Sequence, residues 1–195
     1  TAAAADDWDA HWWSFAAAAE RNPAQAFRRR LVLARLAAHE LPQRYLDIGS
    51  GQGDLAVEVA ERWPDAEIAG IELSRRGVEM AACKQPRARF HKFDLLSGEP
   101  PLPGFEAWAT HATCTEVLEH IDEPQAFLAS AWRWLAPGAL LLVTVPGGPM
   151  SAWSCHVSCR VSTAQFPLMG GSFRPVVAGP GPRRRRSRGA GARAR

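Results

Sequence analysis

The sequence predicts an α/β fold in which a mostly parallel sheet is covered by helices on both faces. Short apolar segments alternate with segments of helical periodicity between residues 23 and 145, and a glycine-rich turn follows the first apolar segment. Such alternation is typical of strands joined by helical crossovers. The chain has 195 residues, 47% of them hydrophobic and 22% charged, so we expect an ordinary globular protein with a sizeable core.

Charged residues are unevenly distributed along the chain. The net charge is +3, but residues 170–195 contain eight Arg and no acid, which leaves 15 basic against 20 acidic residues before them. This mildly acidic main body argues against general nucleic-acid binding, and the run Arg183–Arg186 keeps nucleic acid open as a partner of the tail. No apolar run approaches the roughly 18–20 residues of a membrane helix, and no secretory leader is recognisable. We therefore expect no membrane span and a cytoplasmic protein.

The four cysteines do not indicate a disulfide framework or a zinc site. Cys83 and Cys114 lie in apolar stretches and are expected to be small core residues. Cys155 and Cys159 are separated by three residues, whereas the first pair of a structural zinc site is typically separated by two. Reduced thiols in a reducing compartment are the expectation.

The N-terminal part consists of an aromatic leader and a first helix. Asn22-Pro23 indicates the helix start, because Asn is a good cap and Pro suits the first turn. Phe27 and Leu31 recur at helical spacing, Arg28 and Arg29 are expected to face water, and the helix should end near residue 40. The leader aromatics are expected either to close a ligand pocket or to pack the first helix on the sheet; they are Trp8, Trp12, Trp13 and Phe15.

The remaining elements follow in regular alternation. Strands are expected at residues 44–48, 67–71, 88–93, 106–114 and 139–145, with helices at 54–63 and 74–83 and from residue 122 onward. Ser74 caps the helix that follows it, and Asp122 with Gln125 forms a capping box. Pro137-Gly138 is expected to end the last helix, and the continuous apolar run after it predicts a buried strand.

After residue 150 the periodic pattern decays. The sequence therefore divides into the leader and first helix (1–43), a ligand-binding domain (44–150) and an irregular tail (151–195) that is expected to be disordered. The tail is rich in Arg, Gly and Pro and resembles either an alternative end or a shifted reading frame of a GC-rich gene. Repeating the coding sequence tests the second alternative.

The strongest motif is Asp47-Ile48-Gly49-Ser50-Gly51-Gln52-Gly53, where the first strand turns into a helix. Glycines allow a ligand to approach the backbone, and the helix start favours anions. Glu72 ends the second strand, where a carboxylate can accept both hydroxyls of a ribose, and Asp94 ends the third. A nucleoside-bearing cofactor is predicted; the alternative is a tight turn without a ligand. The glycine spacing and the lack of a following Lys-Ser/Thr pair argue against a nicotinamide cofactor and against ATP.

Together with the segment Thr115–Pro124, these residues resemble class I S-adenosylmethionine-dependent methyltransferases such as ubiquinone-pathway O-methyltransferases, over residues 44–150. The resemblance implies a Rossmann-like fold with Asp47 at the amino end of S-adenosyl-L-methionine, Glu72 at its ribose and Asp94 at its adenine. The other cofactor contacts it implies are Gly49, Gly51 and Gly53 against the methionine part, and Leu73, Leu95 and Thr115. Members of the family complete the sheet with two antiparallel strands, which the sequence predicts to be missing or altered here.

Glu116, Glu119 and His120 follow the fourth strand and would share one face of a helical turn. Two carboxylates and an imidazole suit Mg²⁺ or Mn²⁺, and similar segments are associated with metal in ubiquinone-pathway and small-RNA 2′-O-methyltransferases. Two alternatives remain open, a metal-free general base and a solvated helix start. His120 is the best candidate for a base, because its pKa lies near neutrality, and Glu116 is the second catalytic candidate.

The first functional hypothesis is a methyltransferase that acts on a small-molecule acceptor, most simply at oxygen. The alternatives are a cofactor-binding module whose replaced C-terminus impairs turnover and a metal-dependent RNA 2′-O-methyltransferase. The sequence carries no indication of oligomeric state.

Overall fold

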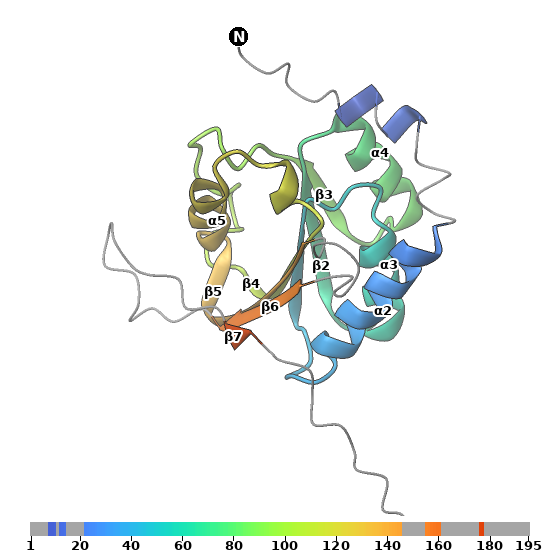
Figure 1. Cartoon of the computed structure of the whole chain (residues 1–195), viewed down its shortest axis with the longest axis vertical. Coiled ribbons are helices and arrows are strands. Elements are labelled where there is room, and N and C mark those ends of the chain that lie inside the picture. Colours follow the sequence, from blue (N-terminus) through green and yellow to red (C-terminus); the bar gives the residue numbers. More distant parts are fainter. Residues whose placement is uncertain (1–7, 11, 15–21, 146–154, 161–175, 178–195) are drawn as a thin grey trace, which may run out of the picture.

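The computed structural model describes residues 8–10, 12–14, 22–145, 155–160 and 176–177. Within them, a seven-stranded sheet has the order β3-β2-β1-β4-β5-β6-β7 (Figure 1). The first five strands are parallel, and they are β1 (Arg44–Ile48), β2 (Glu67–Glu72), β3 (Arg89–Lys92), β4 (Ala109–Thr115) and β5 (Leu135–Val145). The predicted Rossmann-like α/β fold is confirmed.

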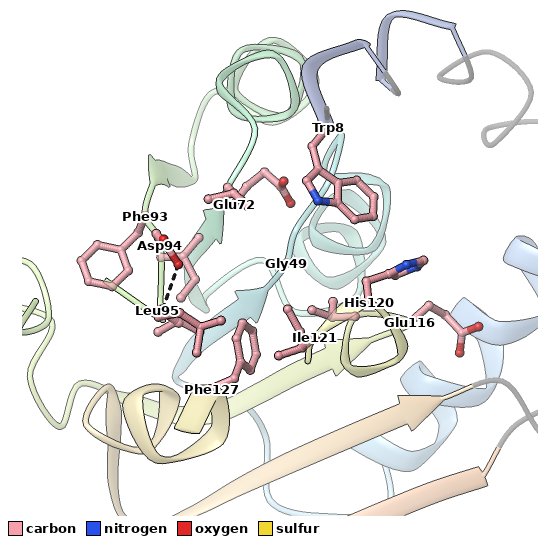
Figure 2. A pocket seen from close by; sticks show the side chains of 14 residues that line it. Trp8, Gly49, Glu72, Phe93, Asp94, Leu95, Glu116, His120, Ile121 and Phe127 are labelled. Atoms are coloured by element: carbon pink, nitrogen blue, oxygen red, sulfur yellow. Dashed lines mark hydrogen bonds between the residues drawn. The ribbon is translucent and has the colours of Figure 1, made fainter. Parts of the chain in front are cut away.

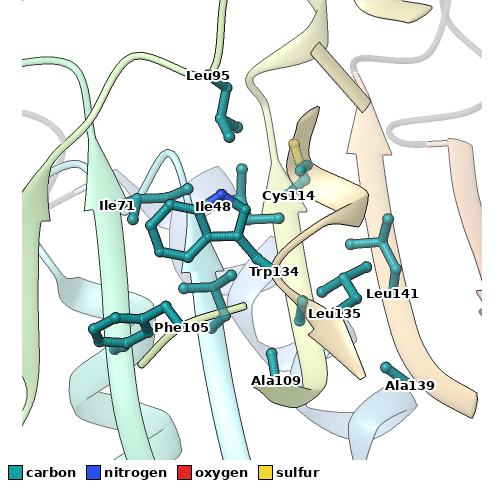
Figure 3. Packing of buried hydrophobic residues seen from close by; sticks show 14 of the residues in the cluster. Ile48, Ile71, Leu95, Phe105, Ala109, Cys114, Trp134, Leu135, Ala139 and Leu141 are labelled. Carbon is teal, nitrogen blue, oxygen red and sulfur yellow. The ribbon is translucent and has the colours of Figure 1, made fainter. Parts of the chain in front are cut away.

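Helices cover both faces of the sheet. Those on one face are α2 (Pro23–Leu36), α3 (Asp54–Arg62) and α4 (Arg75–Lys84), and α5 (Pro124–Trp132) lies on the other (Figure 1). Side chains of β1 alternate between the two layers. Tyr45 packs with α2 and α3, whereas Leu46 and Ile48 pack in the cluster beneath α5. Trp134 lies in the middle of the cluster beneath α5, among side chains from β1, β2, β4 and β5 (Figure 3).

The predicted helix start at Asn22 is confirmed, because its side chain accepts a 2.9 Å hydrogen bond from the backbone N–H of Ala24. The predicted cap at Ser74 is also confirmed, since its hydroxyl accepts from the N–H of Gly77 at 3.0 Å. The first helix ends at Leu36, short of residue 40.

The predicted capping box at Asp122 is wrong. The cap of α5 is Glu123, which makes no side-chain capping bond, and Pro124 occupies the first helical position. The fixed φ of proline starts the helix there and leaves Asp122 outside it. The helix ends at Trp132, and Pro137-Gly138 lies within β5, where Gly138 has φ +81°.

Two antiparallel strands follow residue 150, where the sequence predicted that such strands are missing or altered, so they are not missing. β6 (Cys155–Arg160) pairs antiparallel with β5, and β7 (Val176–Val177) pairs with β6 over two residues. An edge strand presents unpaired backbone groups, so a segment with weak periodicity of its own is drawn into pairing. These residues are therefore strands within the tail predicted to be irregular, and the rest of that tail lies outside the described residues.

Two smaller predictions have different outcomes. Cys114 is buried, as predicted, and burial strongly raises the pKa of its thiol, whereas Cys83 is exposed on α4 and is not a core residue. Among the described residues, no helix is long and apolar enough to cross a membrane.

Candidate functional site

The candidate site lies at the carboxyl ends of β1, β2, β3 and β4. β1 pairs with β2 on one side and β4 on the other, so the strand order reverses next to β1. Open parallel sheets bind ligands at such a switch point. Two cavities open there, and both are lined in part by Gly49 and Glu116.

We name the two cavities by their walls. The β2–β3 cavity is lined by Trp8, Glu72, Phe93, Asp94, Leu95 and His120, among others (Figure 2). The glycine-turn cavity is lined by Trp12, Asp47, Gly51, Gln52 and Thr115, together with Arg29 and Gln25 of α2.

The glycine turn has a left-handed backbone. Gly49 has φ +71° and Gly51 φ +52°, a region that favours glycine. A Cβ at Gly49 would collide with Val117, and one at Gly51 would lie 2.6 Å from the ring of Trp12. Gly53 lines neither cavity. Its missing side chain allows Ala81 of α4 to approach closely, and its contact with the cofactor stays a prediction.

Glu72 holds its carboxylate at the end of β2 through two backbone donors. The N–H of Gly51 donates to Oε2 and the N–H of Ser74 to Oε1, each at 2.9 Å. Each oxygen keeps a further lone pair, so the two oxygens can accept hydrogen bonds from two neighbouring hydroxyls. The side chain is only 7% exposed, and burial raises the pKa of Glu72 against the lowering effect of the two N–H donors.

Asp47 is the most deeply buried acid of the site. Its Oδ1 accepts a 2.8 Å hydrogen bond from the hydroxyl of Thr113, which in turn pairs with the hydroxyl of Tyr45. Burial raises the pKa of Asp47 to about 7, and the charge of Glu72 adds to the rise. A cationic group bound beside it would favour the ionised carboxylate.

Asp94 and the residues after it form the far end of the β2–β3 cavity. The N–H of Leu96 donates to Asp94 Oδ1 at 2.8 Å, which orients the carboxylate. Leu95 is buried, and Leu73 and Leu96 lie partly exposed at the rim. An apolar slot with a carboxylate at its end suits a flat heterocycle that carries an amino group.

The structure does not form the metal platform predicted after β4. Glu116 has φ +55°, and its carboxylate turns away from Glu72 and Asp94 (Figure 2). It accepts a 3.0 Å hydrogen bond from the hydroxyl of Thr144 and lies 3.3 Å from Nε of Arg28. Within the described part of the chain, no three acidic, imidazole or thiol groups could hold a metal ion together. The left-handed backbone at Glu116 and its two partners are the physical reason.

His120 lies on the 3-10 turn η1 (Leu118–His120) and lines the β2–β3 cavity. Its Nε2 is 4.0 Å from Oε1 of Glu119, longer than a hydrogen bond. Burial raises the pKa of Glu119, and the negative charge of Glu116 adds to this rise. The imidazole of His120 therefore lines the cavity beside Glu119, whose pKa is higher than that of an ordinary glutamate.

A sequence model of the family described as "Methyltransferase domain" matches residues 18–167. The chain belongs to this methyltransferase-domain family. Its relatives include the demethylmenaquinone methyltransferase of Deinococcus radiodurans, 34% identical over 119 residues, which are 59% of this chain and 47% of the relative. They also include the trans-aconitate 2-methyltransferase of Methylobacterium radiotolerans, 29% identical over 140 residues, which are 72% of this chain and 51% of the relative. The chain thus spans about half the length of these relatives.

Solved structures of similar fold include an N-methyltransferase and a cyclase. The N-methyltransferase NodS of Bradyrhizobium japonicum WM9, in complex with S-adenosyl-L-homocysteine, has a TM-score of 0.60 and 18% identity, over 71% of this chain and 73% of NodS. The [4+2]-cyclase SpnF has a TM-score of 0.53 and 27% identity, over 64% of this chain and 48% of SpnF. The fold is therefore shared with a cyclase, and the activity has to be argued from the site.

Three residues in or beside the two cavities of this methyltransferase-domain chain were not singled out from the sequence. Asp9 of the leader accepts hydrogen bonds from the hydroxyl of Ser74 and from the N–H of Arg76. Arg29 and Gln25 line the glycine-turn cavity, although Arg29 was expected to face water. Arg29 instead pairs with Glu58 of α3. The one sequence signal that could have placed Gln25 and Arg29 at the site is that their helix shortly precedes the glycine-rich motif. Helical periodicity alone does not show that a polar face of a helix is turned toward a cavity.

Proposed function

We propose that this chain binds S-adenosyl-L-methionine across both cavities and transfers its methyl group to a hydroxyl oxygen of a small-molecule acceptor. One observation carries the proposal. Asp47, Glu72 and Asp94 lie at the carboxyl ends of the parallel strands β1, β2 and β3 and line two cavities that share Gly49 and Glu116 as walls.

The chemistry of the lining residues fits the parts of this cofactor. Asp47 offers a buried carboxylate to its ammonium group, and Arg29 offers a cation to its carboxylate. Glu72 offers two oxygens to the ribose hydroxyls. The apolar side of the β2–β3 cavity, lined by Phe93 and Leu95, suits the apolar faces of the adenine, with Asp94 available to its amino group.

The cofactor supplies an activated methyl group, whose bond to sulfur breaks as a bond to the acceptor oxygen forms. The residues of the chain bind, orient and exclude water, because positioning and desolvation provide most of the acceleration in such a displacement. His120 is proposed to accept the proton that the acceptor hydroxyl loses. Glu116 is a poorer base because Arg28 and Thr144 already hold its carboxylate.

An oxygen acceptor is favoured over the alternatives by the presence of this base. A hydroxyl must lose its proton as the new bond forms, and an imidazole is the side chain that most often accepts such a proton in enzymes. Relatives of the chain include the ubiquinone biosynthesis O-methyltransferase of Psychrobacter cryohalolentis, 31% identical over 116 residues, which are 56% of this chain and 43% of that protein. This name supports an oxygen acceptor.

Calorimetry of the full chain with S-adenosyl-L-methionine is the first test. The variant Glu72→Gln keeps the shape of the side chain but removes its charge, and affinity should fall about tenfold or more. Glu79→Gln is the matched control, because Glu79 lies on the exposed surface of α4 beside Arg75 and Arg76. Absence of binding to the folded wild-type chain contradicts the proposal.

Transfer is tested with labelled cofactor and a panel of phenols, carboxylic acids and amines. Label in the phenols is the expected result, with S-adenosyl-L-homocysteine as the second product, because a phenol carries the hydroxyl proton that His120 is proposed to accept. Label in the carboxylic acids alone would keep the assignment to oxygen and contradict the need for a base. Label confined to the amines contradicts the assignment to oxygen while leaving the cofactor site intact.

A further inference from the structure

The leader contacts the proposed base directly. The indole of Trp8 and the imidazole of His120 pack at nearly right angles, with ring centroids 5.0 Å apart and an interplanar angle of 82°. Edge-to-face packing is a preferred arrangement of aromatic rings, so the contact restricts the orientation of both. Both rings line the β2–β3 cavity (Figure 2).

His120 needs such a contact because its own turn does little to orient it. The 3-10 turn is three residues long, and the side chain of His120 is 44% exposed. Glu119 stands too far away for a hydrogen bond to the imidazole. A base that acts on an acceptor proton must be held within hydrogen-bond reach of that proton, and a freely rotating ring is a poor base.

The position of Trp8 is set by its neighbours in the leader. The carboxylate of Asp9 accepts hydrogen bonds from the hydroxyl of Ser74 and from the N–H of Arg76, and these bonds lower the pKa of Asp9. The N–H of Ser74 also donates to Glu72. The leader is therefore anchored on the same turn that orients the carboxylate proposed to bind the ribose.

We infer that Trp8 is a positioning residue for His120: the leader indole holds the imidazole in the orientation in which it accepts the acceptor proton. This inference rests on the proposed function, because it assigns Trp8 to the same base. It also gives the leader a role in turnover that is separate from covering the cofactor.

The first experiment reads the His120 ring by NMR in the full chain with S-adenosyl-L-homocysteine, with His120→Asn to assign the signals. Trp8→Leu should move the imidazole carbon-bound proton signals, because they lose the ring current of the indole, and Trp8→Phe should retain part of the shift. Trp13→Leu is the control, since Trp13 is 77% exposed, packs against Arg76 and lines neither cavity. The inference is overturned if the chemical shifts of the His120 imidazole protons do not change in Trp8→Leu, or if they change equally in Trp13→Leu.

The second experiment is a double-mutant cycle on turnover at saturating cofactor. Trp8→Leu should lower kcat about fivefold or more in the wild-type background, and Trp8→Phe should restore most of it. In the His120→Asn background, Trp8→Leu should cause no further loss of kcat, although it should weaken cofactor binding equally in both backgrounds. Full additivity in kcat means that Trp8 acts without His120 and overturns the inference.

A pH profile of kcat adds a readout that simple packing does not provide. The charged groups beside the imidazole or on the walls of its cavity are Glu119 on its own turn, Glu116 with its partner Arg28, and Glu72 and Asp94 at the ends of β2 and β3. Trp8→Leu leaves all of them in place, so a moved acid limb reports the His120 ring. An acid limb unchanged by Trp8→Leu and abolished by His120→Asn counts against the inference.

The two proposals fail in different ways. Wild-type protein that binds the cofactor but shows no Trp8 effect on His120 refutes the positioning role alone. Wild-type protein that binds no cofactor refutes the proposed function. The contact between the Trp8 and His120 rings is then still tested by NMR on the ligand-free chain.

Discussion

The hydroxyl of Thr113 donates a 2.8 Å hydrogen bond to the carboxylate of Asp47, whose side chain is almost completely excluded from solvent. One hydrogen bond does not replace the hydration of a charge, and the pKa of Asp47 therefore rises to about 7. The carboxylate proposed to meet the cofactor ammonium thus changes its charge within the physiological pH range.

The affinity for S-adenosyl-L-methionine should consequently increase as pH rises from 5.5 to 8. Below the pKa of about 7, Asp47 must lose a proton before it pairs with the ammonium, so the dissociation constant should fall about tenfold per pH unit there. Above that value the profile should flatten. Calorimetry across this range measures the slope, and Asp47→Asn should bind weakly and with little pH dependence. A wild-type slope that persists in Asp47→Asn assigns the titration to another group.

The same carboxylate should make the cofactor-free protein less stable at high pH. The folded-state pKa lies above the usual value of 3.8 for an aspartate side chain, so between about pH 4 and 7 the folded chain keeps a proton that the unfolded chain has lost. Stability contributed by this proton is present at low pH and is lost as pH rises toward 7. At pH 8, Asp47→Asn should raise the free energy of unfolding by about 2 kcal/mol, because a neutral amide still accepts from Thr113. Urea unfolding at pH 5 and pH 8 tests this, and a smaller gain at pH 5 is required.

The cofactor edge was predictable because each of its markers is local in sequence. The glycine turn follows β1, Glu72 is the last residue of β2, and Asp94 lies two residues beyond β3. Parallel topology brings such strand ends to one edge of the sheet. The ion pair of Arg28 with Glu116 was not predictable, since it joins the first helix to the loop after β4 and requires a left-handed backbone at a residue other than glycine. The pairing of β6 depends on the free edge of β5 and not on periodicity of its own.

Gly51 should tolerate alanine much less well than Gly98, although both have a left-handed backbone. A Cβ at Gly98 meets no atom within 4 Å, so Gly98→Ala isolates the conformational strain, about 1 kcal/mol of stability. A Cβ at Gly51 lies 2.6 Å from the ring of Trp12, so Gly51→Ala must also displace the leader. Thermal unfolding and cofactor calorimetry of the two variants measure the difference. Equal losses of affinity would show that the Trp12 contact is unimportant for binding.

Arg28 and Glu116 should be energetically coupled, because their side chains are only 23% and 15% exposed and their charged atoms are 3.3 Å apart. A double-mutant cycle of Arg28→Met and Glu116→Gln should give a coupling free energy of about 1 kcal/mol by urea unfolding. The cycle of Arg75→Met and Glu79→Gln is the matched control, since that pair is largely exposed and should couple weakly. Coupling no larger than in the control would mean that Arg28 does not hold the Glu116 carboxylate.

The same ion pair predicts how the site responds to Mg²⁺. Glu116 is neutralised by Arg28 and bonded by Thr144, so it is a weak ligand for a divalent cation, and Glu119 and His120 do not combine with it into one ligand set. Cofactor affinity and methyl transfer should therefore be the same in millimolar Mg²⁺ and in chelator. Arg28→Met frees the carboxylate and is the variant in which a Mg²⁺ effect should first appear. Strong dependence of the wild-type chain on Mg²⁺ would require Glu116 to leave Arg28 when the acceptor binds, and loss of the Arg28–Glu116 coupling on adding Mg²⁺ would demonstrate that exchange.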